Sequence, residues 1–212
     1  MKDIFIIKLF IYILVFNIIK MNVGLQKIDW AGIMKKLPLG KDQDSVNARN
    51  KMFRDFDPNG NGYLSLAEVE KGVRDVLKIE VLFNSKPVMM RAFDLAKKTG
   101  AKKSKVSDDY IEKGEFRYFL VYLRQYLEYY VMFNRIDSGS DKKINYNEFV
   151  SAIPEIERMG CKVENAEATF KSIDKNGGGE ITFDEFCHWA INEKLDLQDD
   201  DDFQDADQTT MK

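Results

Sequence analysis

Small oxygen-bearing side chains are concentrated in one twelve-residue stretch, DPNGNGYLSLAE, at residues 57–68. A hard cation such as Ca²⁺ binds about six to eight oxygens, and a loop of this length can supply them from positions 1, 3, 5, 7, 9 and 12. Tyr63 would use its backbone carbonyl, and Glu68 would bind through both carboxylate oxygens. Those six positions hold Asp57, Asn59, Asn61, Tyr63, Ser65 and Glu68. Because Gly62 permits the sharp turn and D-x-[DN]-x-[DN]-G-x5-E is satisfied, the stretch predicts a Ca²⁺ site rather than a chance polar turn.

This first loop belongs to a repeat. Two apolar residues three apart, followed by Asp, precede each copy: Phe53, Phe56 and Asp57; Met90, Phe93 and Asp94; Phe133, Ile136 and Asp137; Phe170, Ile173 and Asp174. An acid followed by an apolar residue closes each copy, at Glu68, Glu115, Glu148 and Glu185. The apolar spacing indicates the inner face of a helix that ends at the Asp. The repeat unit is therefore predicted to be helix, twelve-residue loop and helix, with about ten extra residues in the second loop.

The fourth loop, DKNGGGEITFDE at residues 174–185, is predicted to bind Ca²⁺ more weakly than a fully liganded loop. Its ligand positions hold Asp174, Asn176, Gly178, Glu180, Thr182 and Glu185. Gly178 has no side-chain oxygen, so a water molecule would have to replace one. The consecutive glycines also increase the entropy that is lost when the loop becomes ordered.

The third loop, DSGSDKKINYNE at residues 137–148, is a weak metal candidate with a structural role. The candidate ligands are Asp137, Asp141, Lys143 through its carbonyl, Asn145 and Glu148. Gly139 removes the oxygen at position 3. Lys142 stands where glycine is wanted, so a positive φ becomes costly. Lys142 and Lys143 also place two positive charges beside the ion.

The second copy is predicted to bind no metal, because lysines stand where oxygens are needed. Its role would be pairing: position 8 of the four loops is apolar, at Leu64, Ile111, Ile144 and Ile181. These residues can pair as short antiparallel strands, first loop with second and third with fourth. The extra stretch at residues 99–109 should bulge outward, free of metal. Its lysines would suit an anionic surface, such as lipid headgroups or the acidic face of tubulin, or would simply be solvated.

One long helix is predicted from the second copy into the third, over residues 115–136, which contain no glycine or proline. Apolar residues recur along one face at steps of three or four. A second face carries Tyr118, Tyr122, Tyr126 and Tyr129. Two interpretations stay open: both lobes pack on this helix and bury it, or the aromatic face binds a partner.

Composition excludes several classes of function. A net charge of −3 with 32% charged residues gives no nucleic-acid footprint. Cys161 and Cys187 have no metal-ligand spacing and are predicted to be reduced thiols in a cytosolic protein, and His188 has no histidine or acid pattern around it. Since there is no paired nucleophile and base, no phosphate-binding glycine loop and no zinc motif, the chain is not expected to be an enzyme.

The two ends are set apart from the fold. Residues 1–20 form an apolar leader interrupted by Lys8 and Asn17, which is a signal sequence, an anchor, or a stretch upstream of a true start at Met21. Residues 196–212 form an acidic tail that is predicted to be disordered. Between them lie an N-terminal extension at 21–42, a first loop pair at 43–125 and a second at 126–195.

The chain resembles the calflagins, flagellar calcium-binding proteins of kinetoplastids within the EF-hand superfamily. The resemblance runs from about residue 30 to residue 197 and rests on RAFD at 91–94, EFRYFL at 115–120, VMF at 131–133 and ID at 136–137, IPEIERMGCKVE at 153–164 and IDKNGGGEITFDEF at 173–186. It implies an all-α fold of two paired EF-hand lobes joined by the long helix, and a protein of a cilium or flagellum that senses Ca²⁺ and meets membranes or axonemal partners.

Two features depart from the family. Calflagins begin Met-Gly with a nearby cysteine for dual acylation, whereas Lys2 follows Met1 and Asn22 follows Met21 here, so neither start predicts myristoylation. Calflagins bind Ca²⁺ mainly through the last two loops, whereas the first loop is the best formed here.

The leading hypothesis is a Ca²⁺ sensor of a cilium or flagellum that binds an unidentified protein partner when loaded. One alternative is a structural protein that stays on an axonemal or cytoskeletal scaffold. Another is a secretory or membrane-tethered Ca²⁺ binder, delivered by residues 1–20.

Overall fold

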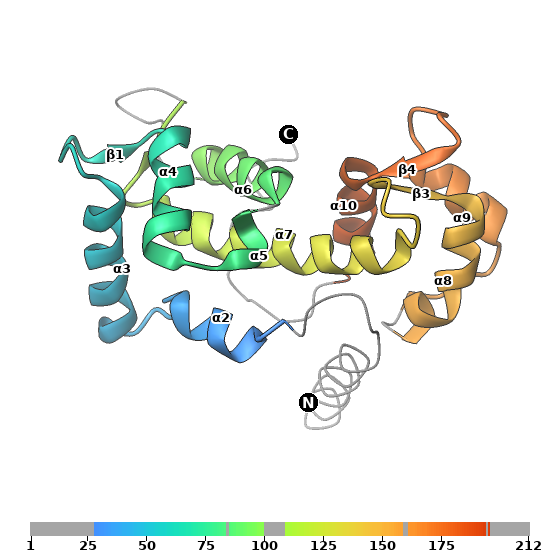
Figure 1. Ribbon diagram of the computed structural model, residues 1–212, viewed down its shortest axis with the longest axis horizontal. Helices are drawn as coiled ribbons and strands as arrows, with labels where there is room; N and C mark the ends of the chain where they lie inside the picture. The colour runs from blue at the N-terminus through green and yellow to red at the C-terminus, as the bar shows by residue number, and fades with distance from the viewer. Residues whose placement is uncertain (1–27, 84, 100–108, 159–160, 194, 196–212) are drawn as a thin grey trace. The chain divides into compact units, whose positions relative to one another are not determined.

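A computed structural model gives the structure of the chain and describes residues 28–83, 85–99, 109–158, 161–193 and 195. The apolar leader, the acidic tail and most of the basic stretch at 99–109 lie outside these residues. Contacts between backbone positions divide the described chain into two units, the first at Asp29–Glu128 and the second from Tyr129 to residue 195. The chain is mainly helical, with two short strand pairs (Figure 1), which confirms the predicted fold class.

The first unit is built around the first two copies of the repeat. Its elements are α2 (Trp30–Lys36), α3 (Gln43–Phe56), β1 (Tyr63–Leu64), α4 (Leu66–Gly72), the π-helix η1 (Val73–Leu77), α5 (Glu80–Phe83), α6 (Lys86–Thr99), β2 (Ile111–Glu112) and the start of α7 (Phe116–Ile136). Its core contains the rings of Phe53, Phe56, Phe116 and Phe119, in edge or stacked contact. The first two of these are the apolar pair that the repeat placed before the first loop.

The second unit holds the third and fourth copies. Its elements are the remainder of α7, β3 (Lys143–Asn145), α8 (Tyr146–Arg158), α9 (Ala166–Ile173), β4 (Glu180–Thr182) and α10 (Phe183–Asn192). Edge contacts join Phe149 to Phe170 and to Trp189, and Trp189 also lies against Phe186. Cys161 and Cys187 are both buried in this unit as free thiols.

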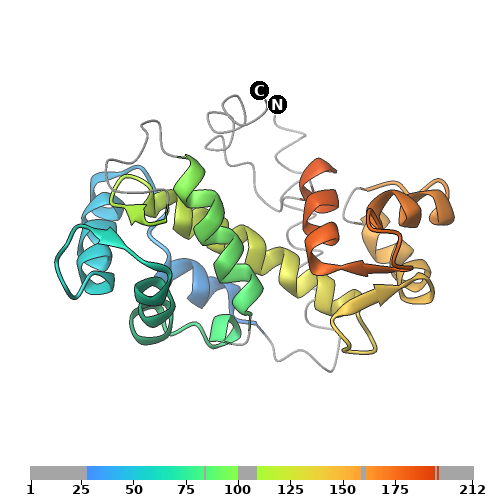
Figure 2. The same cartoon turned by 90° about the horizontal axis from the view of Figure 1, so that it is seen from above.

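The predicted strand pairs are present, each within one unit (Figure 2). Leu64 pairs with Ile111 in the first unit, and Ile144 pairs with Ile181 in the second, in antiparallel register. All four side chains are fully buried. Each pair satisfies backbone groups that burial would otherwise leave without partners, so the second copy supports the first loop.

The second copy departs from the predicted repeat in two respects. Helix α6 does not end at Asp94 but continues to Thr99, because Leu95 to Lys98 are good helix formers and no glycine intervenes. Met90, expected on the inner face, is 40% exposed, and Met89 is buried instead. Because this helix does not have to place Asp94 in a metal loop, it can bury the face that includes Met89 instead of the face that includes Met90.

Helix α7 covers the predicted range, with the boundary between the two units inside it. Every residue of α7 is buried or half-buried. Tyr122, Tyr126 and Tyr129 are buried and Tyr118 is half-buried, so the tyrosine face of α7 is not an exposed surface. Among the described helices, none combines the length and apolar character needed to cross a membrane.

Candidate calcium-binding loops

The first loop is formed where α3 ends and α4 begins. Helix α3 ends at Phe56, and Asp57 is its C-terminal cap. Ser65 caps the N-terminus of α4, and Glu68 occupies the third position of that helix in a reciprocal capping box. The Ser65 hydroxyl and backbone N–H both donate to Glu68 Oε2, at 2.7 and 2.9 Å. The sequence thus uses one helix end to present Asp57 and the next helix start to hold Glu68.

Hydrogen bonds link the candidate ligand positions of the first loop. The Asp57 carboxylate accepts hydrogen bonds from the backbone N–H groups of Asn61 at 3.1 Å and Gly62 at 2.9 Å. Asn61 in turn accepts a bond from the Tyr63 N–H at 3.0 Å. Across the loop, the Asn59 amide donates to Glu68 Oε1 at 2.6 Å. Positions 1, 3, 5 and 12 are therefore brought together, while Tyr63 lies in β1 with its backbone in the strand pair.

The fourth loop repeats this arrangement. Asp174 accepts bonds from the N–H groups of Gly178 at 3.0 Å and Gly179 at 2.8 Å. The Asn176 amide donates to Glu185 Oε1 at 2.8 Å. The Thr182 hydroxyl donates to Glu185 Oε2 at 2.7 Å in a second capping box. The missing oxygen at Gly178 is thus the main difference from the first loop.

The third loop is closed by its own hydrogen bonds. Glu148 Oε1 accepts bonds from the Gly139 N–H at 2.8 Å and the Ser138 hydroxyl at 3.0 Å, and Oε2 accepts one from the Asn145 N–H at 3.0 Å. Within the described residues, no three His, Cys, Asp or Glu side chains come close enough to hold a metal ion, in this loop or in the other two. The role of Ser138 could not be read from the motif, which ignores position 2.

Backbone conformation explains how the third loop keeps its shape. Positions 4 and 6 have positive φ in all three loops: Gly60 and Gly62 in the first, Ser140 and Lys142 in the third, Gly177 and Gly179 in the fourth. Lys142 has a φ of 68°, as its place in the motif predicted. Ser140, with a φ of 58°, was not foreseen, because the motif leaves position 4 free. A left-handed conformation costs about 1–2 kcal/mol for a residue with a Cβ atom.

Hydrogen bonding keeps two of the closing carboxylates ionised. Burial alone would raise the pKa of Glu185, but bonds from the Thr182 side chain and from the Thr182 and Asn176 backbones hold it below the ordinary value. Burial would also raise the pKa of Glu148, but bonds from Asn145, Gly139 and Ser138 lower that pKa below its ordinary value. A lowered pKa stabilises the fold at neutral pH, and this contribution is lost as the pH falls through that lowered pKa. The ionised carboxylate is also the form that binds a metal ion.

A cross-loop ion pair links the two loops of the second unit. The Lys143 Nζ lies 2.5 Å from Glu180 Oε2, and this contact raises the pKa of Lys143. Both residues occupy position 7, where a loop offers only its backbone carbonyl to a cation, so their side chains are free to pair. The ammonium of Lys143 is thereby directed toward Glu180, so Lys142 is the lysine whose charge mainly opposes an ion in the third loop.

The oxygen set of the first loop fits a hard cation. Two carboxylates, two amides, a hydroxyl and a backbone carbonyl are the donors that Ca²⁺ prefers, whereas softer metals select thiolate and imidazole. Helix–loop–helix units with such loops, joined in pairs by short antiparallel strands, define an EF-hand protein. The class therefore implies Ca²⁺ as the bound ion.

Comparison with known proteins identifies the family. Residues 33–123 match the FCaBP EF-hand domain, and residues 128–191 match the EF-hand domain pair. The flagellar calcium-binding protein of Trypanosoma cruzi is 39% identical over 175 residues, which cover 82% of this chain and 83% of that protein. Flagellar calcium-binding protein TB-24 of Trypanosoma brucei brucei is 36% identical over 179 residues, 84% of this chain and 82% of the relative.

The chain belongs to the flagellar calcium-binding protein family. This confirms the resemblance to calflagins and the prediction of a non-enzymatic protein. Coverage differs among the relatives: flagellar calcium-binding protein TB-44A of Trypanosoma brucei brucei is 37% identical over 187 residues, 87% of this chain but 46% of that protein.

Proposed function

We propose that the chain is a Ca²⁺ sensor of a flagellum that binds the ion at the first and fourth loops. The observation that carries the proposal is the first loop, where Asn59 bonds to Glu68 across the loop while Asp57 is fixed by two backbone N–H groups. An ion at this point would replace donors that now satisfy the ligand oxygens. The flagellar setting is supported by relatives whose names place them there.

A sensing role is supported by the way the ligands are mounted. Asp57 ends α3 and Glu68 lies in the first turn of α4, so an ion that draws the two carboxylates together changes the relation between the two helices. In EF-hand sensors such a change opens the helix pair and exposes apolar surface. Phe56 and Val69, adjacent to the two acids, are almost fully buried and would follow the helices.

The third loop is assigned a structural role. Gly139 leaves the loop without an oxygen at position 3, and Ser140 and Lys142 stand at positive φ where the first and fourth loops have glycine. Its candidate ligands, from Asp137 to Glu148, are therefore the least suited of the three sets to hold Ca²⁺. The pairing of Ile144 with Ile181 then supports the fourth loop, as the second copy supports the first.

A constitutive scaffold protein of the axoneme or cytoskeleton is the second candidate function. It is favoured by the two impaired loops, since the third lacks an oxygen at position 3 and the second has lysines where oxygens are needed. Axonemes extracted in Ca²⁺ and in EGTA separate the two functions: a scaffold component is retained equally in both, whereas a sensor changes its retention or its partners. Membrane contact, if it occurs, has to use a route other than myristoylation at Met1 or Met21.

Calorimetric titration of the full chain with Ca²⁺ tests the assignment of sites. We expect two sites, the tighter within about 10⁻⁷–10⁻⁵ M, the range of EF-hand sensors. Glu68→Gln should abolish the tighter site, because an amide cannot bind bidentately as an anion, and Glu185→Gln should remove the weaker one.

Glu148→Gln is the matched control, since it makes the same change in the third loop and should leave both sites in place. Retention of the tightest site in Glu68→Gln would overturn the ranking of the loops. Absence of any binding below millimolar Ca²⁺ would overturn the sensor function.

A further inference from the structure

A short helix that takes no part in either loop is seated on the first unit. The apolar residues of α2 and its C-terminal cap recur at steps of three and four, as one face of a helix does. Trp30, Ile33 and Leu37 are 8%, 8% and 5% exposed, whereas Lys35 and Lys36 are exposed. Segment 29–40, with α2 at its centre, thus covers apolar surface with one face and meets solvent with the other.

Three basic side chains attach this segment to the rest of the first unit, each by donating to a backbone carbonyl. Lys36 Nζ donates to the carbonyl oxygen of Lys78 at 2.7 Å. Arg49 of α3 donates to the carbonyls of Pro38 at 2.6 Å and Gly40 at 2.5 Å. Arg117 of α7 donates to the carbonyl of Leu39 at 2.8 Å. Hydrogen bonds from a charged donor are stronger than neutral ones, so the segment is attached at defined points.

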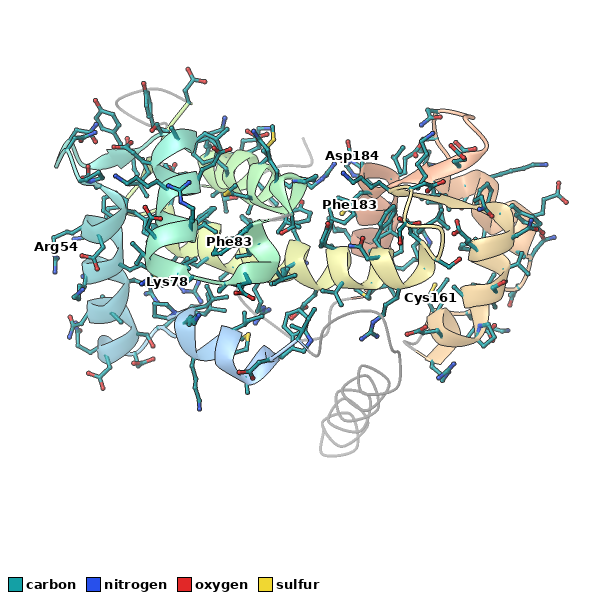
Figure 3. All side chains as sticks on the ribbon, viewed as in Figure 1. Arg54, Lys78, Phe83, Cys161, Phe183 and Asp184 are labelled. Carbon is teal, nitrogen blue, oxygen red and sulfur yellow. The ribbon has the colours of Figure 1, made fainter. Side chains whose placement is uncertain are left out.

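Two of these attachment points lie on the helices that flank the first loop. Arg49 belongs to α3, the helix that ends at Asp57. Lys78, labelled in Figure 3, is the residue that follows η1. The π-helix η1 continues directly from α4, the helix that carries Glu68. Helices α4 and η1 run without a break from residue 66 to 77. A movement of Glu68 would therefore be transmitted along them to the Lys78 carbonyl. Segment 29–40 therefore bridges the two helices whose relation an ion in the first loop would change.

The docked position of α2 also has unfavourable features. The indole N–H of Trp30 is buried and, within the part of the chain that the structure describes, has no hydrogen-bond partner. A buried donor without a partner is destabilising, and undocking would return it to water. Lys78, whose carbonyl accepts the Lys36 bond, is the left-handed C-cap of η1, with a φ of 50°. The apolar face and the basic contacts therefore stabilise the docked position of α2, and the buried indole N–H opposes it.

We propose that segment 29–40 is an internal latch on the first unit, and that Ca²⁺ at the first loop weakens it by moving Lys78 relative to Arg49. Release exposes the apolar face of Trp30, Ile33 and Leu37. This proposal rests on the proposed Ca²⁺ binding at the first loop, and it assigns to that site a segment whose position changes when the ion binds. Because coupling between two equilibria is reciprocal, a weakened latch must also raise the Ca²⁺ affinity of the first loop.

Tryptophan fluorescence can follow the latch, because the chain contains two tryptophans, Trp30 in the latch and Trp189 in the second unit. In full-length Trp189→Phe, Trp30 is the single reporter. We expect Ca²⁺ to shift its emission to longer wavelength and to raise its acrylamide quenching constant about two-fold or more, as a buried indole becomes exposed. The double variant Trp189→Phe with Glu68→Gln should show neither change.

A second experiment measures the Ca²⁺ affinity of the variant Lys36→Met. This substitution removes the hydrogen bond to the Lys78 carbonyl and keeps an aliphatic side chain. We expect the first loop to bind Ca²⁺ about five-fold more tightly, with Trp30 more quenchable before Ca²⁺ is added. Lys35→Met, an exposed neighbour on the same helix, is the matched control and should change neither value.

The outcomes separate the latch from the proposed function. If calorimetry shows Ca²⁺ at the first loop while Trp30 and the Lys36→Met affinity stay unchanged, the latch is wrong and the site stands. If Trp30 becomes less quenchable with Ca²⁺, the sign of the coupling is reversed and the latch is overturned. If Glu68→Gln removes no site, the proposed assignment of the first loop fails.

Discussion

At the scale of single residues, the loops are distinguished by which side chains occupy two left-handed positions. The first and fourth loops place glycine at positions 4 and 6, where positive φ has little cost. The third loop reaches the same conformation with Ser140 and Lys142. The bonds that close around Glu148 and Asp137 offset this cost. The third loop is therefore a metal-loop backbone that its own donors hold in place.

Lys142→Gly should stabilise the second unit. Relief of the positive φ at Lys142 outweighs the added freedom of glycine in the unfolded chain, so we expect the free energy of unfolding to rise by about 0.5–1 kcal/mol. Urea unfolding followed by Trp189 fluorescence, in a Trp30→Phe background, measures it.

Lys143→Gly provides the comparison at the next position. Its φ is not positive, it lies in β3, and its side chain pairs with Glu180, so this variant should lose stability. Equal effects of the two substitutions would contradict the strain argument.

The sequence predicted the candidate ligand positions and the backbone turn of the loops, but not the hydrogen bonds and ion pairs that surround them. The motif fixes Asp57, Glu68 and the left-handed Lys142, because these follow from the geometry of a twelve-residue loop. Ser140 escaped prediction since position 4 is unrestricted in the motif. The pair of Lys143 and Glu180 depends on how far two side chains reach across a strand pair, which the register by itself does not determine.

At the scale of elements, the helix that leaves the first loop changes its type along its length. It begins as α4, passes into the π-helix η1 at Val73, and ends at left-handed Lys78. No glycine or proline follows Gly72 there, so composition gave no sign of the change, and π-helices commonly mark functional positions. Gly72, the last residue of α4, is buried against the Phe56 ring at the end of α3.

Gly72→Ala should destabilise the first unit although alanine is the better helix former. A Cβ atom at Gly72 would lie 2.2 Å from Phe56 Cδ1, and Phe56 is 1% exposed and cannot withdraw. Overpacking of this kind costs about 1–3 kcal/mol, more than the helix propensity of about 1 kcal/mol returns. Because Phe56 precedes Asp57, we also expect weaker Ca²⁺ binding at the first loop.

Gly114→Ala serves as the control in the same unit. A Cβ atom there meets no described heavy atom within 4 Å, so unfolding and Ca²⁺ binding should be nearly unchanged. Chemical unfolding followed by Trp30 fluorescence in a Trp189→Phe background, together with calorimetry, measures both effects. Stability of Gly72→Ala equal to that of the parent would show that α4 shifts freely on Phe56.

The ends of elements were predicted where a functional residue fixes them and missed where none does. Helix α3 ends before Asp57 and α9 ends before Asp174, as the loops require. Helix α6 passes Asp94 because no metal loop requires it to stop there. Because the second copy has no twelve-residue loop, helix propensity determines where α6 ends.

At the scale of the whole molecule, the strand pair of the first unit keeps its register although the second copy carries a basic insertion. Residues 100–108 lie outside the described part of the chain, while Leu64 and Ile111 on either side of the strand pair keep their register. Closure of a longer loop costs only about 0.6 kcal/mol per doubling of its length. The insertion can therefore differ in charge without changing the paired strands.

Charge reversal of Lys102, Lys103 and Lys105 to Glu should leave the Ca²⁺ affinity of the first loop within about two-fold of the parent, because exposed charges are screened beyond about 8 Å at physiological salt. Calorimetry at two salt concentrations checks this. A large loss of affinity at both concentrations would mean that the insertion is part of the site, and that the division of the repeat into a binding and a supporting copy is wrong.

The pairing of a well-formed loop with a defective neighbour, repeated in both units, determines the shape of the dose–response curve. On the proposed assignment each strand pair holds a single ion, so no second occupant reinforces the first and the Hill coefficient of each unit is close to one. Occupancy then rises over roughly two decades of Ca²⁺ concentration instead of switching at a threshold. Such a protein reports the amplitude of a calcium transient as a graded signal.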